Sequence, residues 1–430
     1  MPSETPTSYL RSRPAGRVAG SLLRVALACL LLVALLGLLL RAMPFLPALP
    51  FSYHNLLHAH SHFAFGGWVH PVLLALLLRA FPELRTRIRT GHWIALAMLL
   101  PVSALGMLLT FPVQGYGPAS IAFSTLSLLA GFYEAALVFR ALKGLPATPA
   151  RRLLRAAMGW MILSAIGPFA TGPIAASGGL GSPLYYDAIY AYLHFQYNGC
   201  FSLLVLALWY RSLEKEGRRA SLRAYRYFHW AVLPTYALSL LWNGPPLWVH
   251  AIGGAGALLQ AAGFVCLLRD SRAVRRLPPL LLLSAVALAG KLLLQLLSAL
   301  PAVALLAATQ RPFVIAYLHL VLLGFITLFV FAQLPVSRLR NLGTGLFLAS
   351  FVSTELLLAG QGLGWLLPHH PTWLLACSIT FPLGVLLLLL GQIRVAESKR
   401  EVRVVVKLNV SPRSSDGGVR LPADCDCASS

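Results

Sequence analysis

Charged side chains are scarce in this chain of 430 residues. Aspartate, glutamate, lysine and arginine make up 11% of it, whereas hydrophobic residues make up 58%. Soluble globular proteins carry about 25% charged residues, so the composition excludes a soluble globule. Apolar runs of roughly 20 residues, the length that crosses a bilayer, recur along the whole chain. The sequence therefore predicts an all-α integral membrane protein with the lipid bilayer as its first partner.

Acidic residues are the scarcest charged type: 13 Asp and Glu stand against 35 Lys and Arg, which gives a formal net charge of +22. The basic residues fall almost wholly in alternate short loops, the pattern that orients membrane helices with their basic loops in the cytoplasm. Topology thus accounts for the charge, and no nucleic acid is expected as a partner. The basic loops cover residues 79–89, 140–155, 211–226, 269–276, 338–340 and 394–407.

Two further signals are missing. The six cysteines include no C-x-x-C motif, so neither a disulfide framework nor a zinc ribbon is expected. No clear small-residue cleavage site follows the first apolar run, which favours an uncleaved first span over a signal peptide.

Twelve apolar segments are long enough to span a membrane. They lie near residues 23–43, 57–79, 92–112, 118–140, 155–176, 188–210, 228–243, 247–268, 278–300, 312–333, 342–366 and 372–393. We therefore expect a cytoplasmic segment at 1–22, a twelve-helix domain at 23–393 and a cytoplasmic, disordered tail at 394–430. Both termini are expected in the cytoplasm, and the location expected is the inner membrane of a cell, crossed many times.

Histidine is concentrated at one place. Five histidines fall within seventeen residues of the second segment, at His54, His58, His60, His62 and His70. A titratable ring loses hydration at the mouth of a membrane helix, so such residues are rare unless a metal, a ligand or a polar group receives the nitrogen lone pair. The cluster indicates a functional site.

The expected topology gives other histidines the same depth. His194 and His319 lie about two turns into the sixth and tenth segments, and His250 lies near the outer end of the eighth, level with residues 54–62. Two such imidazoles can ligate a haem iron from both faces, and three or four can hold copper or zinc. The alternative is a histidine that bonds a neighbouring helix.

Helical spacing divides the cluster into two faces. His54 and His58 share one face, as do His58 and His62, while His60 points to roughly the opposite side. One face suits a haem and the other a second metal. The glycine pair at 66–67 permits close approach of a porphyrin or of another helix.

These segments resemble the catalytic subunit of haem-copper oxidases and nitric-oxide reductases, over most of the chain. HAHSHFAFGGWV in the second segment is similar to the family's low-spin haem ligand segment. The resemblance implies His60 as axial ligand, with His58 and His62 as the next choices. His319 in AYLHLVLLG is similar to the second histidine of the family's H-x-H motif, which implies that it is the opposite axial ligand.

HFQYNG in the sixth segment resembles the copper-ligand segment of the same family. The resemblance implies His194 as a copper ligand beside Tyr197, with Asn198 where nitric-oxide reductases carry a glutamate. The chain departs from the family at Tyr317, which replaces the first histidine of H-x-H, and in the seventh segment, which lacks paired histidines; His250 could partly substitute. Tyr317 either ligates a ferric haem or packs.

Ionisable residues inside the apolar segments add candidates. Lys291, Glu134 and Glu355 are costly in hydrocarbon and indicate a proton path; the alternative is a pair of Lys291 with either acid. The catalytic candidates are therefore Lys291 and Glu134, together with Tyr197 and Asn198 of the sixth segment. Arg311, two turns before His319, either binds haem propionates or anchors the helix at the interface.

The leading hypothesis is a membrane haem protein that transfers electrons to a small gas such as oxygen or nitric oxide or binds it. Copper or another divalent metal is expected as a second cofactor, held by His194 with a neighbour from His54, His58, His62 or His250. A cytochrome c or a quinol would donate electrons, and accessory membrane subunits are further candidate partners. Two alternatives remain: a haem and copper protein of the nitric-oxide response without turnover, and a histidine-rich divalent-metal transporter.

Overall fold

The computed structural model describes residues 6–218, 221–271 and 277–409, and the side chains within 15–397 of these ranges. All regular structure in these ranges is helical, and η marks segments of 3₁₀ or π geometry. The first half comprises α1 (Pro6–Ala42), η1 (Met43–Phe45), α2 (Tyr53–Phe63), η2 (Ala64–Val69), α3 (His70–Ala80), α4 (Pro82–Arg87), α5 (Thr90–Gln114), α6 (Pro118–Leu142), α7 (Pro149–Ser164), α8 (Ile166–Ile174), η3 (Ala175–Gly179), α9 (Pro183–His194), η4 (Phe195–Phe201) and α10 (Ser202–Lys215). The second half comprises α11 (Leu222–Thr235), η5 (Tyr236–Asn243), α12 (Leu247–Ser271), α13 (Pro279–Ser298), α14 (Pro301–Thr309), α15 (Arg311–His319), η6 (Leu320–Thr327), α16 (Leu328–Ala332), α17 (Arg338–Gly362), α18 (His370–Ser378) and α19 (Thr380–Asn409).

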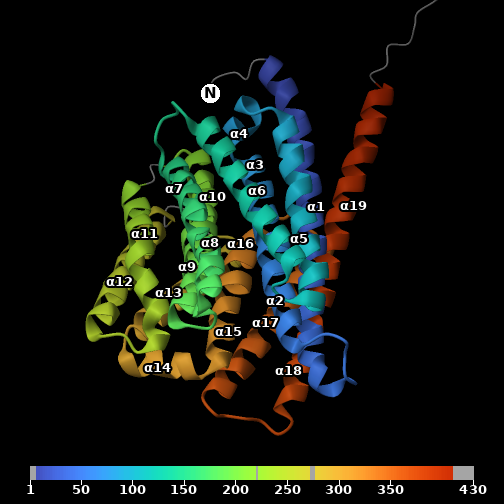
Figure 1. Cartoon of the computed structure of the whole chain (residues 1–430). Coiled ribbons are helices and arrows are strands. Elements are labelled where there is room, and N and C mark those ends of the chain that lie inside the picture. Colours follow the sequence, from blue (N-terminus) through green and yellow to red (C-terminus); the bar gives the residue numbers. More distant parts are fainter. Residues whose placement is uncertain (1–5, 219–220, 272–276, 410–430) are drawn as a thin grey trace, which may run out of the picture.

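Ten helical stretches among the described residues are long and apolar enough to cross a membrane. The chain is thus an all-helical, multi-pass membrane protein, and the ten coincide with ten of the twelve expected segments. The other two, 188–210 and 228–243, are helical as α9–η4–α10 and α11–η5 but are not among the ten. Figure 1 shows them side by side with the other helices in one bundle.

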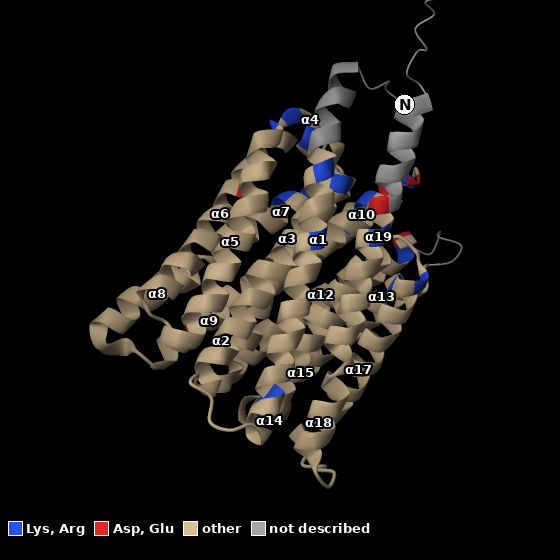
Figure 2. Ribbon diagram, turned by 90° about the vertical axis from the view of Figure 1, so that its right-hand side faces the viewer, with Lys and Arg blue, Asp and Glu red and all other residues tan. Residues whose placement is uncertain are grey.

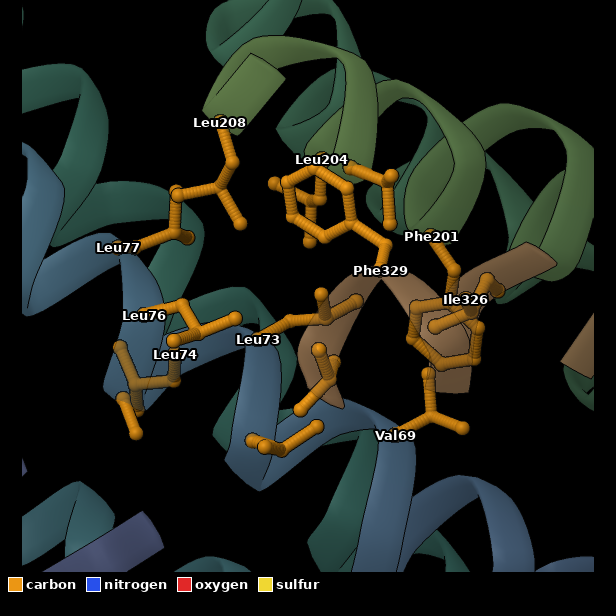
Figure 3. Packing of buried hydrophobic residues seen from close by; sticks show 14 of the residues in the cluster. Val69, Leu73, Leu74, Leu76, Leu77, Phe201, Leu204, Leu208, Ile326 and Phe329 are labelled. Carbon is orange, nitrogen blue, oxygen red and sulfur yellow. The ribbon is translucent and has the colours of Figure 1, made fainter. Parts of the chain in front are cut away.

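Three helices that are interrupted by a π segment meet at the centre of the bundle: α2–η2–α3, α9–η4–α10 and α15–η6–α16. In α2–η2–α3, 83% of the most apolar stretch is buried, against 33–44% in the other nine candidate spans. Its apolar face at Val69 and Leu73 meets Phe201 and Leu204 from η4–α10 and Phe329 from α16 (Figure 3). Because lipid is as apolar as these side chains, close van der Waals packing, and not removal from water, stabilises this contact.

Each of these three helices changes from α to π geometry directly after a histidine-bearing stretch. The π segments are η2, η4 and η6, and they contact one another: the Trp68 indole donates to the Thr327 hydroxyl at 3.0 Å, and the Phe65 and Phe201 rings lie 5.6 Å apart. Short π segments occur frequently at functional sites. Here they separate a closely packed half of the bundle from the half that carries His54–His62, His194 and His319.

Basic side chains gather at one end of the bundle, around α4 (Figure 2). Glu83 of α4 is 8% exposed and forms two salt bridges. Its Oε1 lies 2.8 Å from Nε of Arg151 in α7, and its Oε2 lies 3.4 Å from a terminal guanidinium nitrogen of Arg211 in α10. Since one buried carboxylate binds two guanidinium groups, it fixes three helix ends together. We call this the basic end, and the end with α14 and α18 the histidine end.

The chain ends differ from the hydropathy boundaries. α1 begins at Pro6, inside the segment expected at 1–22, and α19 continues to Asn409, beyond the boundary at 393. The stretch AESKRE at 396–401, directly after that boundary, consists mostly of residues with good helix propensity, which favours the continuation. The remainder of the expected tail, residues 410–430, lies outside the described residues.

Candidate functional site

The histidines of α2 are placed by a well-defined helix start. The Ser52 side chain accepts a hydrogen bond from the Asn55 backbone N–H at 3.1 Å, which caps the helix. His54 and His58 then face each other, with 2.9 Å between their Nε2 atoms. The His60 ring instead lies against α1, where a Cβ on Gly37 would be 3.2 Å from its Cε1 atom. The two predicted faces are confirmed.

His60 and His319 lie together between α1, α2 and α15. The His319 ring is close enough to His60 for the charges of the two rings to interact. The Val33 carbonyl accepts a hydrogen bond from the His60 ring, whereas its Nδ1 is buried and has no partner. His319 Nδ1 lies 3.0 Å from Glu355 Oε1, and among the described residues nothing bonds its Nε2. Each ring therefore keeps one nitrogen available.

Arg41 at the end of α1 completes this group. Its charge acts on His60 and on Glu355, and its NH1 atom is buried without a hydrogen-bond partner. Sequence reasoning missed Arg41, although a basic residue at the histidine end, against the general distribution of charge, was a signal. Arg311 is exposed at the start of α15, and it has no hydrogen bond to the described residues.

The second face of α2 packs against α5 and the turn that follows it. His62 stacks on Phe111 with 4.4 Å between ring centroids, and its Nε2 lies 3.0 Å from the Tyr116 hydroxyl. Burial raises the pKa of Tyr116 to about 12, so the phenol keeps its proton and can donate to His62. His54, His58 and His62 thus form a stripe whose inner end is fixed and whose outer end is exposed.

His194 is 1% exposed and is held by hydrogen bonds on both sides. Its Nε2 lies 2.8 Å from the Val232 carbonyl, and its Nδ1 lies 3.1 Å from the Asn198 amide nitrogen. A carbonyl only accepts, so Nε2 carries the proton and Nδ1 accepts from Asn198. His194 therefore makes the contacts of a histidine that bonds a neighbouring helix, here α11. This is the alternative to the expected role as a metal ligand.

A series of polar side chains extends from His194 across α11, α12 and α13. The Thr235 hydroxyl lies 3.5 Å from His194 Nε2, Gln260 donates to Thr235 at 3.4 Å, and Lys291 donates to Gln260 at 3.2 Å. All four side chains are buried. Sequence reasoning selected Lys291 and His194 but missed Thr235 and Gln260, because uncharged polar residues are common in membrane helices.

Lys291 pairs with neither Glu134 nor Glu355, the two acids that the sequence offered as partners. Glu134 Oε2 lies 2.7 Å from His70 Nε2, with both side chains buried, and Glu355 bonds His319. An acid inside a membrane bundle needs a compensating group, and both buried Glu134 and half-buried Glu355 bond a histidine on another helix. Lys291 bonds the amide of Gln260 instead.

Two tyrosines face each other beside Asn198. The Tyr197 and Tyr317 ring centroids lie 6.2 Å apart, and both hydroxyl groups interact with the Asn198 side chain. Tyr317 is one turn before the η6 segment and two residues from His319. It therefore connects the His194 group to the His60–His319 group.

The remaining candidates lie apart from these groups. His250 Nδ1 lies 3.1 Å from the Ala299 carbonyl, and among the described residues no three histidine, cysteine or acidic side chains form a metal-binding group. At Gly66 an added Cβ would meet Met107 of α5 at 3.0 Å, so this glycine accommodates a neighbouring helix; at Gly67 it would meet Phe63, one turn earlier, at 2.8 Å. No known protein family and no curated protein matches this chain.

Proposed function

We propose that this chain is a membrane haem protein that transfers electrons to, or binds, a small gas molecule, with the architecture of haem-copper oxidase subunit I. The proposal rests on one observation: His60 of α2 and His319 of α15 are close enough for their charges to interact, and each has one nitrogen engaged by a protein acceptor and the other nitrogen free. Two imidazoles of that kind are the donor set of a six-coordinate haem iron.

The contacts of both rings fit ligation. Metal-bound histidines usually donate their second N–H to a carboxylate or a backbone carbonyl, which fixes ring orientation and tautomer. Glu355 serves His319 in this way, and the Val33 carbonyl serves His60. His60 is thereby favoured over His58 and His62, which bond His54 and Tyr116 on the other face.

Haem also carries two propionate groups, which need cationic partners. Arg41, with its buried and unpartnered NH1, is suited to one carboxylate, and exposed Arg311 to the other, because guanidinium groups bind carboxylates through two parallel hydrogen bonds. The bound haem would supply one-electron chemistry; these residues would bind and orient it.

By the positive-inside rule we assign the basic end to the cytoplasm. The histidine end would then lie on the outer side of an inner membrane, and both termini would lie in the cytoplasm. A cytochrome c or a quinol would then donate electrons. The series of hydrogen-bonded side chains from Lys291 to His194 supports electron transfer over mere binding of the gas, since a buried lysine joined to polar side chains can move protons to the reaction.

The decisive experiment is a reduced-minus-oxidised optical spectrum of the purified protein. We expect split, sharp bands of bis-histidine haem, lost in His319→Ala and in His60→Ala and kept in the control His369→Asn. His369 is exposed at the histidine end with φ +56°, a conformation that asparagine tolerates. Bands that survive both alanine variants would refute the assignment.

A divalent metal on the opposite face of α2 is a second candidate, favoured by the 2.9 Å between the Nε2 atoms of His54 and His58. Zinc–nitrogen bonds of about 2.0–2.1 Å place two adjacent nitrogen ligands roughly 3 Å apart. Titration calorimetry with Cu²⁺ or Zn²⁺ should show binding that His58→Asn removes and His369→Asn leaves intact. Equal binding by both variants would exclude this site.

A further inference from the structure

A groove lies between α7 and α11 at the basic end, away from all the histidines discussed above. Its volume is about 560 Å³. One wall is a stripe on α7 with Arg152, Arg155 and Gly159, and the other is α11 with Tyr225 and His229. From Arg152 to Leu163 the stripe extends about 16 Å along the helix, from the helix end toward the middle of the bundle.

Charge and polarity change along this groove. At its outer end the Arg152 guanidinium lies over the Tyr225 ring at 5.8 Å, and its buried Nε has no hydrogen-bond partner. Arg155 next to it donates to the Leu142 carbonyl. Further in, Trp160 donates to His229 at 3.2 Å, and Gly159 leaves open space, with nothing within 4 Å of an added Cβ.

We infer that the groove binds an anionic phospholipid, with the phosphate at Arg152 and Arg155 and an acyl chain along Gly159 and Leu163. Basic pockets between membrane helices on the cytoplasmic side recognise anionic headgroups, and Trp160 lines the inner part of the groove with Leu163, at the level of the acyl chain. An unpartnered guanidinium N–H at the polar end and uncovered apolar surface at the inner end together match a lipid better than a soluble anion.

Two variants of the full-length protein test the site in different ways. Arg152→Gln removes the phosphate partner, and Gly159→Leu fills the groove without changing charge. The control Arg89→Gln removes an exposed basic residue of the same end. Delipidated protein in detergent is given phosphatidylglycerol, phosphatidylcholine or inorganic phosphate, and retained lipid is measured by native mass spectrometry together with the melting temperature.

We expect phosphatidylglycerol to be retained by the unmodified protein and by Arg89→Gln and to raise their melting temperatures, and both effects to be lost in Arg152→Gln and Gly159→Leu. Arg152→Lys should bind more lipid than Arg152→Gln because it keeps the charge. Equal retention of phosphatidylcholine, an equal effect of inorganic phosphate, or retention by Gly159→Leu would each overturn the proposal. The haem spectrum plays no part in this readout.

Discussion

His70 Nε2 lies 2.7 Å from Glu134 Oε2 in the interior of the bundle, with the carboxyl side chain fully covered. The pair joins α3 to α6, and Glu134 Oε1 has no hydrogen-bond partner. Because the pair is enclosed by apolar side chains, neither residue can lose its partner without leaving a polar group unsatisfied in a medium that cannot hydrate it.

Glu134→Ala should therefore destabilise the protein strongly. Removing one partner of a buried pair costs about 3–5 kcal/mol, whereas Glu134→Gln keeps a hydrogen-bond acceptor for His70 and should cost less. Chemical unfolding in mild detergent, followed by tryptophan fluorescence, measures both. If Glu134→Ala unfolds at the same denaturant concentration as the unmodified protein, the pair does not stabilise the fold.

Lys291 and Gln260 should respond unequally to substitution. Gln260→Leu leaves the buried Lys291 amino group without its 3.2 Å partner and should lower the free energy of unfolding by about 1–3 kcal/mol. Lys291→Met removes the buried polar group and its need for a partner, so it should be neutral or stabilising. The same unfolding assay measures both variants. If Lys291→Met destabilised the protein more than Gln260→Leu, the prediction would be contradicted.

The bond between Trp68 and Thr327 should couple the π segments η2 and η6. Trp68→Phe removes the 3.0 Å hydrogen bond and should cost about 1 kcal/mol. In a double-mutant cycle with Thr327→Val, the two losses should not add, because each substitution deletes the same contact. Additive losses would mean that the bond contributes nothing to stability.

Glu355 should act on the proposed haem through His319. Glu355→Ala frees the His319 ring to rotate, and losing such an outer partner typically weakens metal binding by about 10–100-fold. Glu355→Gln keeps an acceptor and should retain more haem. The haem-to-protein ratio after incubation with excess apomyoglobin measures retention; unchanged retention in Glu355→Ala would exclude this role and leave the His319→Ala test unaffected.

Much of this molecule could be predicted from the order of its residues. Apolar segments of membrane length predict helices whatever their neighbours, because a backbone in lipid must satisfy its own hydrogen bonds. The fixed angle between successive helical residues placed His54, His58 and His62 opposite His60 without knowledge of the surroundings. Local geometry was sufficient for these features because they lie within a single helix.

Only the tertiary structure decided which side chains meet. Depth along a helix was predictable, but rotation and neighbours depend on packing between segments far apart in sequence. Glu134 therefore pairs with His70, Lys291 bonds Gln260, and His194 bonds both Val232 and Asn198. The position of Arg41 near His60 and Glu355 likewise follows from how α1 packs against α2 and α18, since in a membrane helix contacts are selected by shape and by polar partners.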